Sequence, residues 1–220
     1  MAGAASGRGR GVSGARVRSG MAASCVVAMV GLLLFIAVAA WTQFARQDLD
    51  WVRATLSLYL HGPWGLALRI AYGLLALAIT LLGVAMYRHG VGPRRSAAAP
   101  LLFVCAGLGL AGVAVGDSWL PQRAPLAWPL VHGLSAMTAF LCASVAMLLQ
   151  AWYLRREPGW QRAAAVLWWW AWAAFVLLWA HVLWRGPPRG AGQKLVIAVI
   201  VGWLLWLAWA GWRRSRVRSG

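Results

Sequence analysis

Acidic residues are scarce in this 220-residue chain, which has four Asp and Glu against 21 Lys and Arg. Charged residues of both signs make up 11% of the chain, whereas soluble domains carry roughly 25%. So few carboxylates argue against a paired-carboxylate active site. The sequence also contains no phosphate-binding glycine loop, GxSxG motif or dinucleotide fingerprint. The chemistry of soluble enzymes is therefore not indicated.

Cysteines are few as well. Cys25, Cys105 and Cys142 each lie inside an apolar run, without a CxxC spacing or a nearby histidine. We interpret all three as small buried hydrophobes, and not as disulfide partners or metal ligands.

Apolar residues are abundant instead: 62% of the chain is hydrophobic, and 17 residues are tryptophan. A helix needs ~20 apolar residues to cross a ~30 Å hydrocarbon core. Continuous apolar runs without period-two alternation indicate helices. We therefore predict an all-α membrane protein, a bundle of six transmembrane helices. The predicted spans are approximately residues 22–43, 64–87, 100–120, 129–153, 163–184 and 195–212.

The net charge of +17 does not indicate nucleic acid, because the basic residues flank apolar segments. Membrane lipid is the predicted partner. Of the 21 Lys and Arg residues, 14 lie on the side of the two termini and six on the other side, while Arg69 falls within a predicted helix. The positive-inside rule then places both termini in the cytoplasm.

The ends of the chain differ in composition from the apolar middle. Residues 1–20, rich in Gly, Ser, Ala and Arg, are expected to be disordered. Met21 follows them, so this segment could also be an over-called start of the gene. The predicted transmembrane domain covers residues 21–213, and residues 214–220 form a basic cytoplasmic tail.

Two patterns bear on packing. Small residues recur four apart in the third predicted helix, at Cys105 and Gly109 and at Gly112 and Gly116, which predicts close helix contacts. Tryptophans near segment ends on the outer side are expected to form an interfacial belt: Trp41, Trp51, Trp64, Trp119, Trp128 and Trp184.

Polar side chains gather at the predicted outer end. Asp117 closes the third predicted helix and His132 opens the fourth, with a proline-rich loop between them. We predict that this loop turns both side chains into one outward-facing polar pocket, which binds a small polar ligand or a lipid headgroup. The further pocket candidates are Arg69, Gln193, Lys194, His61, Tyr59, Ser135 and His181.

Arg69 is the charged residue deepest in a predicted span. Intramembrane charges usually face the bundle and find a partner, and Asp117 lies at a similar depth. We predict an Arg69–Asp117 ion pair with His132 hydrogen-bonded nearby. The alternative is that Arg69 extends to the outer headgroups.

No cofactor is predicted, but two metal sites stay open as alternatives. Zinc could take His61, His132, His181 and Asp117, and a haem could take His132 and His181. No HxxxH or HExxH spacing supports the zinc site.

Three classes of function remain. The leading one is a non-enzymatic protein that binds or senses a ligand or lipid. The second is a metal-dependent membrane hydrolase that uses the histidines and Asp117 with Ser57 or Ser135. The third is a small proton-coupled transporter, although the halves show no repeat and no helix is clearly broken at mid-membrane.

Three short motifs occur together: S-x-Y-x-x-G-P-x-G at residues 57–65, Asp117 followed by the "VHGLSA" of His132, and "GAGQK" with Gln193 and Lys194. They resemble those of a bacterial membrane family catalogued as domain of unknown function 998, over about residues 25–212. The resemblance implies six transmembrane helices in the inner membrane of a bacterium, and no known reaction. The chain departs from the family at "VAVGD", where a Phe-Pro-type turn is frequent, and at Lys194, where Arg is usual and a bidentate contact would be expected.

Overall fold

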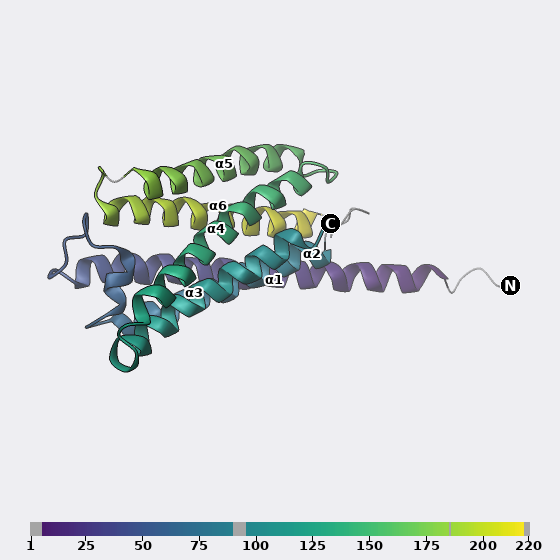
Figure 1. Ribbon diagram of the computed structural model, residues 1–220. Coiled ribbons are helices and arrows are strands. Elements are labelled where there is room, and N and C mark those ends of the chain that lie inside the picture. Colours follow the sequence, from purple (N-terminus) through teal and green to yellow (C-terminus); the bar gives the residue numbers. More distant parts are fainter. Residues whose placement is uncertain (1–5, 90–95, 185, 218–220) are drawn as a thin grey trace.

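The computed structural model describes residues 6–89, 96–184 and 186–217. In this part of the chain it contains six α-helices, a short 3-10 helix and no strand (Figure 1). The elements in chain order are α1 (Ser6–Ala45), η1 (Leu56–Leu60), α2 (Gly65–His89), α3 (Ala98–Arg123), α4 (Trp128–Leu154), α5 (Gln161–Leu183) and α6 (Arg189–Val217).

Each of the six α-helices contains a span long and apolar enough to cross a membrane. The mean hydropathy of these spans runs from 1.7 to 2.7, because long apolar runs leave few polar side chains to interrupt them. The prediction of an all-α bundle of six transmembrane helices is confirmed.

The two basic ends differ from the sequence expectation. α1 begins at Ser6, so the structure places residues 6–20 in a helix where disorder was expected, while residues 1–5 lie outside the described part. Residues 6–20 contain five glycines and one alanine, so intrinsic propensity does not favour this helix. It continues from the apolar span, which already supplies the costly first turn. α6 likewise continues to Val217, through the start of the predicted tail.

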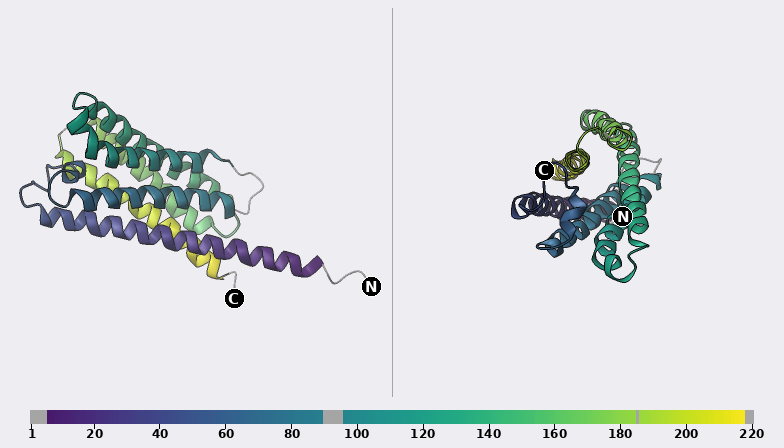
Figure 2. Two further views of the ribbon diagram at one scale, coloured as in Figure 1. Left: turned by 90° about the horizontal axis from the view of Figure 1, so that it is seen from below. Right: turned by 60° about the vertical axis from the view of Figure 1, so that its left-hand side comes forward.

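The helices form a closed ring. Each helix contacts the next one along the chain, and α6 returns to contact α1 (Figure 2). α1 begins and α6 ends at the same end of the bundle, and α3 ends at the opposite one (Figure 1). We call this opposite end, which holds the end of α3 and the start of α4, the Asp117 end. That it faces outward remains a prediction.

Close contact between α3 and α4 depends on two of the glycines in the small-residue pattern, Gly109 and Gly112. A Cβ atom on Gly109 would lie 2.7 Å from the backbone oxygen of Ser135, and one on Gly112 would lie 2.6 Å from the Ser135 hydroxyl. Gly116 has only ordinary contacts. Cys105 is exposed and Cys142 half-buried, so the expectation of three buried cysteines is correct only for Cys25.

The tryptophans of the expected belt are exposed at five of the six positions. The exception is Trp128, which is partly buried because its indole turns into the bundle.

Candidate functional site

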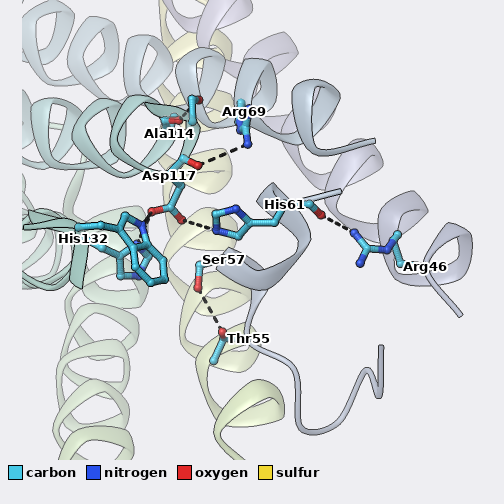
Figure 3. Close-up of polar contacts among 10 residues, drawn as sticks. Arg46, Thr55, Ser57, His61, Arg69, Ala114, Asp117 and His132 are labelled. Atoms are coloured by element: carbon cyan, nitrogen blue, oxygen red, sulfur yellow. Dashed lines mark hydrogen bonds and ion pairs between the residues drawn. The ribbon is translucent and has the colours of Figure 1, made fainter. Parts of the chain in front are cut away.

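Asp117 is the centre of the polar cluster at the end of α3 (Figure 3). Its carboxylate is fully buried, and one oxygen, Oδ1, accepts hydrogen bonds from Trp128 Nε1 at 2.9 Å and pairs with His132 Nδ1 at 2.8 Å. Trp128 and His132 are four residues apart on α4, so they share one face of that helix. When the carboxylate is ionised, it fixes His132 with its proton on Nδ1.

The second carboxylate oxygen of Asp117, Oδ2, is buried without a hydrogen-bond partner. The nearest charged contact is His61 Nε2 at 3.8 Å, an ion pair whenever His61 is protonated. The His61 ring also meets the Trp128 indole edge-on, with centroids 5.9 Å apart. Two histidines from distant parts of the chain therefore flank one buried carboxylate.

The position of His61 depends on Arg46. This arginine is only 8% exposed, and its guanidinium donates to both the Asp48 carboxylate, at 2.7 Å, and the backbone oxygen of His61. The bond from Arg46 lowers the pKa of the Asp48 carboxyl below its usual value. In the sequence, Arg46 is only one of the six basic residues on the predicted outer side, because nothing local marks an arginine that folds back onto a loop.

The predicted ion pair between Arg69 and the Asp117 carboxylate does not form. Arg69 Nη2 instead donates to the backbone oxygen of Asp117, at 3.4 Å, and Arg69 Nε is buried without a partner. The carboxylate points toward α4, where Trp128 and His132 donate to it, while Arg69 reaches α3 from the side of α2. Arg69 and Asp117 lie close together, as their similar depth predicts, but Arg69 bonds the backbone of Asp117 and not its carboxylate.

Gln193 connects α6 to the loop that carries His61. Its Oε1 accepts a hydrogen bond from the backbone N–H of Leu56, at 2.8 Å, at the first residue of η1. The contact spans 137 residues of sequence, so it ties the start of α6 to the α1–α2 connection beside the site.

This contact can be tested by replacing Gln193 with leucine, which has a similar volume and no acceptor. The Leu56 N–H is then left without its partner, and we expect the free energy of unfolding to fall by about 1 kcal/mol. Denaturant titration in detergent micelles measures the change. Gln193→Glu retains an acceptor and serves as the control, and equal stability of the leucine variant and the natural protein would contradict the role.

Lys194 and Tyr59 lie together but apart from Asp117. Lys194 Nζ donates to the backbone oxygen of Trp51 at 2.6 Å and lies 5.0 Å from the centre of the Tyr59 ring. Tyr59 is fully buried, and burial raises the pKa of its phenol above the usual value. Of the predicted pocket residues, these two therefore form a separate contact between α6 and the α1–α2 connection.

Two cavities meet at His132. The central cavity lies inside the ring and is lined mainly by Ala, Leu, Ile, Val and Phe, with Ser57 and His132 among its few polar side chains. Its volume of about 50 Å³ admits only a few water molecules. The second, which we call the lateral cavity, lies between α4, α5 and α6 and has a volume of about 440 Å³. That size falls within the range of roughly 300–1,000 Å³ typical of ligand pockets.

The lateral cavity also contains His181, which the sequence analysis assigned to the zinc and haem alternatives. His181 lies against Gly192 of α6, across the cavity from the Asp117 cluster. In the described part of the chain, no three His, Cys, Asp or Glu side chains are arranged to hold a metal ion. The four-ligand zinc set is therefore not assembled, because His181 faces a different helix pair.

The two candidate serines do not contact the Asp117 carboxylate within the described residues. The hydroxyl of Ser57 is 3.1 Å from that of Thr55, and Ser135 packs against Gly112 of α3. Trp128, which donates to the Asp117 carboxylate, was not among the predicted site residues. Its spacing of four residues from His132 was the available signal.

A family model matches most of the chain. Residues 29–210 match the model of a family described as protein of unknown function (DUF998). No curated protein and no solved structure matches the chain.

Proposed function

The chain belongs to the family described as protein of unknown function (DUF998), and we propose that it is a membrane protein that binds a small ligand or a lipid headgroup in the lateral cavity. The observation that carries the proposal is His132, which is held by the buried Asp117 carboxylate and lines that cavity. The distribution of Lys and Arg supports an orientation with this cavity on the outer side of a bacterial inner membrane.

The Asp117–His132 arrangement suits recognition. Asp117 holds the imidazole by Nδ1, which fixes the ring and leaves Nε2 for another partner. Within the described residues no hydrogen bond to Nε2 is formed. Gln193 lines the same cavity with a side-chain amide. Such a site combines a mostly apolar wall with a few oriented polar groups, as ligand pockets usually do.

Gly133 offers a way to close the lateral cavity without disturbing helix packing. It lines the cavity, and a Cβ atom there would meet nothing within 4 Å. We expect the natural protein, purified in mild detergent, to retain a bound molecule at near-unit stoichiometry in native mass spectrometry. The Gly133→Phe variant should lose it, because the phenyl ring occupies the cavity.

The matched control is Gly73→Phe. Gly73 is also helical, and a Cβ atom there would likewise meet nothing within 4 Å, but Gly73 lines neither cavity. Its spectrum should equal that of the natural protein. If Gly133→Phe retains the same bound mass as Gly73→Phe, the lateral cavity is not the binding site.

A hydrolase is the second candidate, favoured by the same Asp117–His132 contact, because a carboxylate on Nδ1 is how many enzymes orient a histidine general base. Ser57 lines the central cavity with His132 and would be the nucleophile. The structure favours ligand binding over hydrolysis, because Ser57 lines the central cavity, which has room for little beyond water. Ser57 does not line the larger lateral cavity.

A further inference from the structure

The lateral cavity changes in polarity along the membrane normal. Its polar side chains lie at the Asp117 end of the bundle, where α4 and α6 begin and α5 ends; they are Thr55, His132, His181, Arg189 and Gln193. Its deeper wall is apolar and includes Phe140, Leu141 and Leu178. Leu141 is nine residues beyond His132 on α4, which corresponds to about 13 Å along the helix. The cavity therefore matches a molecule with a polar head and an apolar tail.

The cavity is also open toward the lipid. α4 and α5 lie together near their connection and diverge toward the Asp117 end (Figure 1). Three side chains of the cavity wall reach the surface of the bundle: Met137 is 60% exposed, Val182 50% and Trp179 40%. A molecule in the bilayer could enter sideways between the two helices, without passing through water.

Charge at the polar end favours an anion. Arg189 lines the cavity, is exposed, and has no acidic side chain within ion-pair distance among the described residues. By contrast, Arg46 and Arg53 at the same end are each paired with an aspartate. Asp117 is buried behind His132 and Trp128, so it does not present its charge to the cavity.

We propose that the ligand of the lateral cavity is an anionic phospholipid, which enters from the bilayer between α4 and α5, places its phosphate beside Arg189 and lays an acyl chain against Leu141 and Leu178. This inference rests on the proposed function, and it names the ligand class of the same site. A basic side chain at the membrane surface contributes about fivefold to the binding of an anionic lipid.

The experiment compares two lipids with identical chains. The protein is reconstituted into nanodiscs containing equal amounts of phosphatidylglycerol and phosphatidylcholine, released into detergent, and examined by native mass spectrometry. We expect one retained lipid, with about a fivefold preference for phosphatidylglycerol. Arg189→Gln should lose the preference. Arg123→Gln is the matched control, because Arg123 is an exposed arginine at the same end that stacks on Trp119 and lines neither cavity.

Two results would overturn the inference while leaving the proposed function intact. One is that the two lipids are retained equally, or that Arg123→Gln reduces the preference for phosphatidylglycerol as much as Arg189→Gln does. In either case Gly133→Phe would still lose all retained lipid. The other is that soluble glycerol 3-phosphate binds the detergent-purified protein through Arg189 and displaces the lipid, which would identify a water-soluble phosphate ester as the ligand. If Gly133→Phe retains lipid as well as Gly73→Phe does, both the inference and the proposed function fail.

Discussion

Replacing Asp117 with alanine lowers the free energy of unfolding by about 2–4 kcal/mol, as expected when a buried charged acceptor is removed from its donors. Trp128 Nε1 and His132 Nδ1 would both lose their partner at Oδ1. Because the carboxylate is fully buried, no solvent replaces it. Denaturant titration in detergent micelles measures the loss, and native mass spectrometry of the same variant should show loss of the retained ligand, because His132 is no longer oriented.

Two further variants separate the parts of this effect. Trp128→Phe removes one donor and keeps an aromatic ring, so it should cost about 1 kcal/mol and leave ligand retention intact. Combined with Asp117→Ala it should add little, because the hydrogen bond is already absent. An Asp117→Ala protein as stable as the natural one would show that the cluster contributes nothing to folding.

Replacing Gly109 with alanine should lower the free energy of unfolding by about 1–3 kcal/mol, through overpacking. The new Cβ atom would lie 2.7 Å from the backbone oxygen of Ser135 and 2.8 Å from the backbone nitrogen of Ala139. Backbone atoms in a helix cannot rotate away as a side-chain end can. α3 and α4 would have to separate, and the shift would extend to the nearby Asp117–His132 contact.

The same substitution at Gly73 should raise the free energy of unfolding. A Cβ atom there meets nothing within 4 Å, so the change only improves helix propensity, by roughly 0.5–1 kcal/mol. Thermal unfolding in detergent, followed by circular dichroism, compares the two variants directly. Equal melting temperatures for Gly109→Ala and Gly73→Ala would contradict the close approach of α3 and α4.

The amino-acid sequence by itself was sufficient for the transmembrane architecture. Span length and hydropathy are local properties, and a run such as residues 129–153 has no stable alternative to a helix in lipid. Sequence was also sufficient to bring Asp117 and His132 together, because the short connection between α3 and α4 leaves their facing ends little freedom. The disorder expected of residues 6–20 was the main local difference, since composition alone does not register a helix that continues from a neighbouring span.

Which atoms meet was decided only by the tertiary structure. Arg69 and Trp128 lie at similar depths, yet the carboxylate of Asp117 turns to Trp128, and Arg69 reaches only the backbone. His181 was grouped with His132 by depth, but it belongs to the wall formed by α5 and α6. Depth in the membrane can be read along the chain, whereas the direction of a side chain around its helix axis depends on how the helices cross and pack. That packing is set by contacts such as Gly109 against Ser135, which join residues of different helices.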